Sequence, residues 1–106
     1  MAALFRQNGA LVVLAEDVGR HNAVDKVVGA AALRGEQLDR CFLGLSGRLT
    51  ADIVLKAARV GIPIVASLAA AIDSGVVVAE RAKMTLVGFA RGQRMNIYTC
   101  PERIIV

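Results

Sequence analysis

Hydrophobic residues follow two different periods along the 106-residue chain, and each period predicts one kind of element. Short, nearly continuous apolar runs are typical of strands that are covered on both faces of a sheet. Such runs predict strands at residues 2–6, 11–14, 41–45, 62–66, 84–89 and 95–98. The polar segment between the first two runs contains Asn8-Gly9, which predicts a hairpin turn.

Helices are predicted where apolar side chains recur three and four positions apart, because this spacing places them on one helix face. The segments with this spacing are residues 20–34, 50–60 and 73–81. Gly35 and Gly61 follow the first two segments and are typical helix stops, while Thr50 and Asp73 are candidate side-chain caps. Residues 69–72 fit either a loop or a helix.

Strands and helices alternate after the first hairpin, in the order β-β-α-β-α-β-α-β-β. This order predicts a single α/β domain over residues 1–106, with a mostly parallel mixed sheet and an antiparallel hairpin at its start. Helices on both faces of that sheet would make the domain a three-layer α/β/α sandwich.

The composition predicts that a partner covers part of the surface of this domain. The apolar fraction is 56% and the mean hydropathy is +0.55, which is more apolar surface than a small domain can bury by itself. We therefore expect a second copy or a further part of the same protein to cover some of it. The longest apolar region, residues 62–82, is interrupted by Asp73-Ser74-Gly75 and does not predict a membrane span. Without a signal-peptide pattern, the expected location is the cytoplasm.

The net charge of the chain indicates which class of partner it binds. The net charge of +4 and the sequence pI of about 9.7 favour acidic or phosphate-bearing molecules. The three Phe residues and one Tyr do not alternate with Lys or Arg runs, which argues against nucleic acid. An anionic small molecule fits the excess charge. Cys41 and Cys100 are too far apart in the sequence to form a metal-binding or dithiol motif.

Polar residues gather in three segments that each follow a predicted strand, at residues 17–21, 46–48 and 91–94. Because the carboxyl ends of parallel strands share one edge of a sheet, we expect at least some of these segments to meet there and to bind an anion. The turn Ser46-Gly47-Arg48 suits phosphate, because glycine lets the backbone approach the ligand closely. The arginines of the last two segments can grip phosphate oxygens in a bidentate manner.

Each of these groups also has a structural interpretation. Asp17 can cap the helix that follows it, and Arg91 and Arg94 can form a solvated rim. His21 and Asp25 are spaced as a helix-surface pair, or as the general base of a hydrolase or deaminase, although no nucleophile or metal-ligand set accompanies them. A further alternative is a non-catalytic assembly or phosphate-binding module in which the polar turns have no reaction to serve.

One stretch has a sequence pattern that is more informative than composition or periodicity. The run EDVGRHNAVDK at residues 16–26 resembles the signature of the FdhD family, the formate dehydrogenase accessory proteins. Further segments resemble the family in its own order, at residues 46–48, 56–58, 61–63, 85–89, 91–92, 94, 98–99 and 101–103. The resemblance covers nearly all of the chain.

The resemblance implies a fold similar to cytidine deaminase and a homodimeric, cytoplasmic sulfur carrier. Proteins of this family accept persulfide sulfur from a cysteine desulfurase and pass it to the molybdenum or tungsten cofactor of formate dehydrogenase. That cofactor carries guanine nucleotides, and the family's pocket also accepts guanosine diphosphate. A membrane or a nucleic acid is not among the implied partners.

The resemblance also implies which residues of this chain bind the cofactor: Asp17, Arg20, His21, Asn22, Lys26, Ser46, Gly47, Arg48 and Arg91. The family's sulfur-carrying C-x-x-C lies upstream of the first residue here, and neither Cys41 nor Cys100 matches it. We therefore expect no catalytic residue in this chain, which would be the C-terminal domain of a longer protein or a separately encoded half. At residues 69–72 the chain also lacks the family's usual Ser, Pro and Thr.

Overall fold

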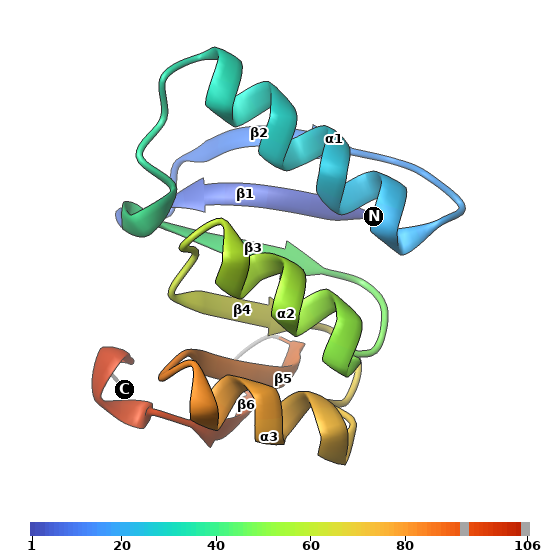
Figure 1. Ribbon diagram of the computed structural model, residues 1–106, viewed down its shortest axis with the longest axis vertical. Coiled ribbons are helices and arrows are strands. Elements are labelled where there is room, and N and C mark those ends of the chain that lie inside the picture. Colours follow the sequence, from blue (N-terminus) through green and yellow to red (C-terminus); the bar gives the residue numbers. More distant parts are fainter. Residues whose placement is uncertain (92–93, 105–106) are drawn as a thin grey trace.

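The computed structural model describes residues 1–91 and 94–104, which form one six-stranded sheet and three α-helices (Figure 1). The elements in chain order are β1 (Ala2–Arg6), β2 (Leu11–Ala15), α1 (Arg20–Leu33), η1 (Leu38–Arg40), β3 (Cys41–Leu45), α2 (Ala51–Arg59), β4 (Ile64–Ser67), α3 (Asp73–Arg81), β5 (Thr85–Arg91), β6 (Arg94–Thr99) and η2 (Pro101–Arg103). The predicted strands and helices are therefore confirmed, and residues 69–72 form a loop. The predicted turn after β5 includes residues 92–93, which lie outside the described residues.

The sheet is mixed, with the strand order β2-β1-β3-β4-β5-β6. β3, β4 and β5 pair in parallel, while β1 runs antiparallel to both of its neighbours and β6 runs antiparallel to β5. The strands β2, β3, β4 and β5 consequently share one direction, and their carboxyl ends lie along one edge of the sheet. The predicted α/β class and mixed sheet are confirmed.

All three α-helices lie on the same face of the sheet, as Figure 1 shows with the helices in front of the strands. The three crossovers from β2 to β3, from β3 to β4 and from β4 to β5 all step across the sheet in one direction. Right-handed crossovers that step the same way place their helices on the same face. The described residues therefore supply two of the three predicted layers, and the expected helices on the opposite face are not formed by them.

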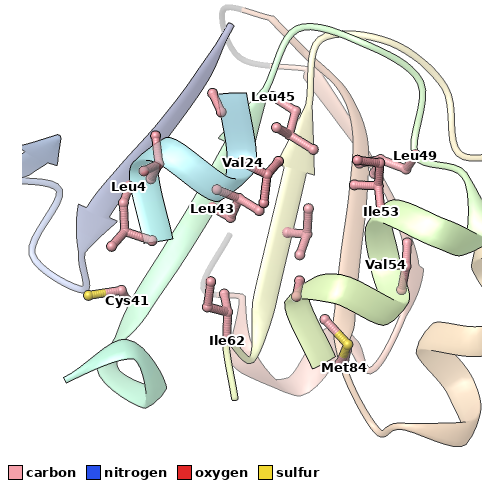
Figure 2. Packing of buried hydrophobic residues seen from close by; sticks show 14 of the residues in the cluster. Leu4, Val24, Cys41, Leu43, Leu45, Leu49, Ile53, Val54, Ile62 and Met84 are labelled. Carbon is pink, nitrogen blue, oxygen red and sulfur yellow. The ribbon is translucent and has the colours of Figure 1, made fainter. Parts of the chain in front are cut away.

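The hydrophobic core fills the space between the sheet and the helices (Figure 2). Leu4 and Leu43 point into it from the central strands, and Val24, Ile53 and Val54 meet them from α1 and α2, all of them fully buried. Each such side chain contributes about 1.5–3 kcal/mol by leaving water. This packing holds α1 and α2 in place over the carboxyl ends of their preceding strands.

The opposite face of the sheet is apolar and carries no helix among the described residues. Phe5 and Phe42 stack there with ring centroids 5.0 Å apart, and the Phe5 ring lies over Gly44, where a Cβ would approach it to 3.1 Å. Leu11 and Leu14 of β2 pair with β1 beside them and are 56% and 51% exposed. We call this surface, with Phe5, Leu11, Leu14 and Phe42, the helix-free face. It is a surplus apolar surface of the kind that the composition predicts.

The helix ends show where local signals hold and where they fail. Gly35 and Gly61 adopt φ angles of +74° and +82° directly after the caps of α1 and α2, as the helix-stop prediction requires. Thr50 occupies the N-cap position of α2 as predicted, although its hydroxyl makes no capping hydrogen bond. The predicted cap of α3 is wrong, because the N-cap residue is Ile72 and Asp73 is the first residue of the helix.

Candidate functional site

A pocket of about 560 Å³ opens at the edge of the sheet where β2 and β3 end. The loop after β2 and the loop after β3 come together there because only β1 separates the two strands, so that Met1 lies between the loops. The residues that line the pocket are Met1, Asp17, Val18, Gly19, Arg20, His21, Asn22, Ser46 and Gly47. The carboxyl ends of strands in α/β sheets are the usual place for ligands.

Asp17 organises the turn that leads from β2 into α1. Its Oδ1 accepts a hydrogen bond from the Gly19 amide at 2.9 Å, and its Oδ2 accepts one from Lys26 Nζ at 2.7 Å. The Lys26 ammonium, followed by the Gly19 amide, lowers the pKa of Asp17 below its ordinary value of 3.8. Asp17 is therefore ionised at neutral pH, and Lys26 supports the turn from outside the pocket lining.

The first turn of α1 presents positive charge to the pocket. Gly19 occupies the N-cap position in an extended conformation and provides no side chain to accept the first amides of the helix. The first turn, which begins with Arg20 and His21, contains no acidic residue. Free amides and the positive end of the helix dipole at such a place favour an anion.

The second wall of the pocket is the turn after β3. The Ser46 amide donates to the Met1 carbonyl at 3.2 Å, and Ser46 Oγ accepts from the Met1 amino group at 3.1 Å. A Cβ on Gly47 would lie 3.8 Å from Arg20 Cδ, so the Arg20 side chain runs close along this turn. Within the described residues, no amide hydrogen bond is formed by Gly47 or Arg48. These amides are available to an anionic ligand.

The structure separates the predicted arginines. Arg48 is exposed and directly follows the pocket-lining Gly47, so it lies at the border of the pocket. Arg91 is exposed at the end of β5, on the same edge of the sheet but two strands beyond β3. At the usual strand spacing β5 lies about 10 Å from β3 across the sheet. Arg91 lies further from the end of β3 than this, because it comes four residues after Val87, the last β5 residue that pairs with β4. Arg94, which begins β6, is also exposed.

His21 and Asp25 lie one turn apart on α1, and no hydrogen bond joins them among the described residues. The Asp25 carboxylate instead forms an ion pair with Lys56 of α2 at 2.9 Å. In the part of the chain that the structure describes, no group of three or more His, Cys, Asp or Glu side chains could hold a metal ion.

Both cysteines lie at the opposite edge of the sheet from the pocket. Cys41 is the first residue of β3, whereas the pocket lies beyond the last residue of that strand. Its thiol is buried, and this burial raises its pKa. Cys100 follows β6, which runs antiparallel to β5 and so ends at the same edge as Cys41.

Sequence reasoning missed Ser67, the last residue of β4. Its hydroxyl is buried and donates to the Gly47 carbonyl, so it supports the pocket wall from behind. A single serine at the end of an apolar strand is the only local signal, and it does not distinguish this role from ordinary turn chemistry.

No helix in the described part of the chain is long and apolar enough to cross a membrane.

Comparisons with known proteins cover nearly the whole of this chain. Residues 1–105 match the profile of the FdhD/NarQ family. The chain is similar to sulfur carrier protein FdhD of Methanothermobacter thermautotrophicus, with 51% identity over 90 residues, or 85% of this chain and 36% of that protein. It is also similar to sulfur carrier protein FdhD of Thermoplasma acidophilum, with 50% identity over 104 residues, or 98% of this chain and 37% of that protein.

A crystal structure of a candidate formate dehydrogenase accessory protein from Desulfotalea psychrophila is also similar, with a TM-score of 0.89 and 45% identity. The alignment covers 98% of this chain and 46% of that one. The chain therefore spans less than half the length of the relatives described above.

Proposed function

This chain belongs to the FdhD/NarQ family, and we propose that it forms the cofactor-binding part of an FdhD-type sulfur carrier. In this proposal the complete protein takes sulfur from a cysteine desulfurase and delivers it to the molybdenum or tungsten guanine-dinucleotide cofactor of formate dehydrogenase. This cofactor would be the cargo of the protein. The part described here would hold the nucleotide end of that cargo.

The observation that carries the proposal is the pocket between α1 and the turn after β3. Arg20 and the first turn of α1 form one side, and Ser46 and Gly47 form the other. The amides of Gly47 and of Arg48 at the pocket's border have no acceptor among the described residues. Amides at a helix start combined with a guanidinium suit the two phosphates of a guanosine diphosphate unit. His21 and Asn22 also line the pocket and would contact the ligand in this proposal.

The other predicted residues would contribute at longer range. Asp17 and Lys26 would hold the turn, as their ion pair indicates, and Ser46 would position the opposite wall. A bis-guanine-dinucleotide cofactor is long, so Arg91, two strands beyond β3 on the same sheet edge, would meet a second phosphate group of the cargo.

Sulfur would reach the pocket from a cysteine outside this chain. Sulfur transfer needs a thiolate beside the acceptor, and both Cys41 and Cys100 lie at the far edge of the sheet. The chain by itself is thus expected to bind the cofactor without transferring sulfur. The helix-free face is where the rest of a longer protein or a second protomer would pack.

A calorimetric titration of the purified 106-residue chain with guanosine diphosphate tests the proposal. We expect saturable binding that is weakened by Arg20→Ala and by His21→Ala. Arg81→Ala, at the far end of α3, is the matched control and should bind as the wild type does. Guanosine without phosphate should bind much more weakly, because the pocket offers chiefly anion-binding groups. Absence of saturable binding by the wild type would refute the proposal.

A non-catalytic assembly module is the second candidate, and the helix-free face is the observation that favours it. The same titration separates the two. In an assembly module, Arg20→Ala and His21→Ala would leave any nucleotide binding unchanged, while substitutions on the helix-free face would abolish association with a partner.

A further inference from the structure

We infer that Ser67 is a positioning residue for the phosphate-binding wall of the pocket, an inference that rests on the proposed function. Ser67 ends β4 and is 2% exposed, and it does not line the pocket. Its hydroxyl nevertheless touches the turn that does. The role assigned to it is to hold the Gly47–Arg48 peptide group in the orientation that the ligand requires.

The Ser67 hydroxyl makes two hydrogen bonds that tie together the loops after β3 and β4. Its Oγ donates to the Gly47 carbonyl at 2.5 Å and accepts from the Ala69 amide at 3.0 Å. The Ala69 amide donates to a lone pair of the hydroxyl oxygen, so the single hydroxyl proton remains free for the Gly47 carbonyl. Both loops lie at the carboxyl ends of neighbouring parallel strands, so this tie crosses the sheet edge.

Planarity of the peptide group transmits this bond to the ligand side of the turn. The Gly47–Arg48 peptide is trans, so its carbonyl and its amide N–H point in opposite directions. Holding the Gly47 carbonyl against β4 therefore directs the Arg48 N–H away from β4. That amide is one of the two in the turn with no acceptor among the described residues.

Backbone hydrogen bonds make the support rigid. The Leu68 amide donates to the Leu45 carbonyl at 3.1 Å, and the Leu49 amide donates to the Ala70 carbonyl at 3.1 Å. These bonds flank the Ser67 bond on both sides and use only main-chain atoms of the loop after β4. Ser67 is thus the one side chain that joins the two loops by a hydrogen bond within the described residues, so its removal should free the Gly47 peptide without undoing the loops.

Thr99 provides a matched control. It is 4% exposed, and its Oγ1 also makes two hydrogen bonds, donating to the Met84 carbonyl at 2.7 Å and accepting from the Leu86 amide at 2.9 Å. It ends β6, at the sheet edge opposite the pocket. Removing either hydroxyl leaves one carbonyl and one amide without their partner, at a part-buried site for Ser67 and a buried site for Thr99, so Thr99→Val should destabilise the fold at least as much as Ser67→Ala.

The experiment compares Ser67→Ala, Ser67→Thr and Thr99→Val with the wild-type chain in guanosine diphosphate affinity and in urea unfolding. We expect Ser67→Ala to weaken binding about tenfold, the equivalent of one lost well-oriented hydrogen bond. Thr99→Val should lose at least as much stability as Ser67→Ala without a change in affinity. Ser67→Thr keeps the hydroxyl and should bind guanosine diphosphate as the wild type does. In NMR spectra, adding the ligand should change the chemical shift of the Arg48 amide in the wild type. The same addition should leave this chemical shift unchanged in Ser67→Ala.

Three outcomes would overturn the inference, each in a different way. If the wild type binds and Ser67→Ala binds equally well, Ser67 has a structural role only and the proposed function stands. If the wild type does not bind guanosine diphosphate, the proposed function fails and the positioning role falls with it. Equal weakening by Thr99→Val and Ser67→Ala would show a general stability effect and would also contradict the inference.

Discussion

The Lys26 ammonium donates a hydrogen bond to Asp17 Oδ2 at 2.7 Å, nine positions back along the chain, and this bond closes the turn between β2 and α1. Since the same turn provides one side of the pocket, Asp17→Ala should weaken guanosine diphosphate binding about tenfold by releasing both of its hydrogen bonds. Asp17→Asn keeps an acceptor for the Gly19 amide and should have a smaller effect. Calorimetry of both variants, beside Arg81→Ala as control, checks this order. An Asp17→Ala variant with wild-type affinity would contradict it.

Stability should fall in acid because of the same carboxylate. Lys26 and the Gly19 amide lower the pKa of Asp17 in the folded state, so the unfolded chain binds a proton more readily than the folded one. The stabilisation is therefore present above the ordinary pKa of 3.8 and is lost as the pH falls through the lower folded value. Urea unfolding over a pH series measures this loss, which should be smaller in Asp17→Asn.

Glu36 provides the control for the acid dependence, because Arg6 lowers the pKa of Glu36 in the same direction at the other edge of the sheet. Glu36→Gln should remove its own share of the acid dependence and leave that of Asp17. If Asp17→Asn lost stability in acid as steeply as the wild type, the Asp17 pair would not stabilise the fold.

The two cysteines should differ in reactivity. The Cys41 thiol is 2% exposed and its pKa is raised, chiefly by burial, whereas Cys100 is partly exposed. Iodoacetamide should modify Cys100 in the folded chain and Cys41 only after unfolding in urea, because the thiolate is the reactive form. Mass spectrometry of Cys100→Ser should therefore show almost no modification under native conditions. Rapid modification of Cys41 in that variant would show that β3 is less protected than its burial indicates.

Gly75 and Gly29 should respond in opposite ways to alanine. Gly75 lies in the first turn of α3, where a Cβ would overlap the Leu49 carbonyl oxygen. Gly75→Ala should destabilise the fold by about 1–3 kcal/mol because backbone must move. Gly29 lies within α1 with open space around it, so Gly29→Ala should stabilise by about 0.5–1 kcal/mol. Urea unfolding measures both, and a stabilised Gly75→Ala would contradict the packing of α3 against this loop.

The helix-free face should make the isolated chain self-associate. Leu14 is 51% exposed on an edge strand beside Leu11, so Leu14→Lys places a charge on both the apolar surface and the open edge. Analytical ultracentrifugation should show a shift towards the monomer. Leu33→Lys, at the exposed end of α1, is the control and should leave association unchanged. Equal effects of the two substitutions would indicate nonspecific association rather than use of this face.

The local elements of this protein could be predicted from the sequence because their signals lie within a few residues. The apolar spacing of residues 20–34 and the glycine that follows them specify α1 and its end. The apolar runs that become β3 and β5 are typical of strands inside a sheet, and both strands have a neighbour on each side. The polar turns at residues 17–21 and 46–48 could likewise be placed after strands, and the signature at residues 16–26 indicated the family.

Strand order decided the rest, and no local pattern encodes it. The insertion of β1 between β2 and β3 brings Arg20 against Gly47 and leaves Arg91 two strands away. The common direction of the crossovers puts the three α-helices of the described residues on one face. Contacts between distant segments pair Asp25 with Lys56 and hydrogen-bond Ser67 to Gly47. Periodicity and turn chemistry are properties of neighbouring residues, whereas these pairings depend on which distant segments the sheet brings together.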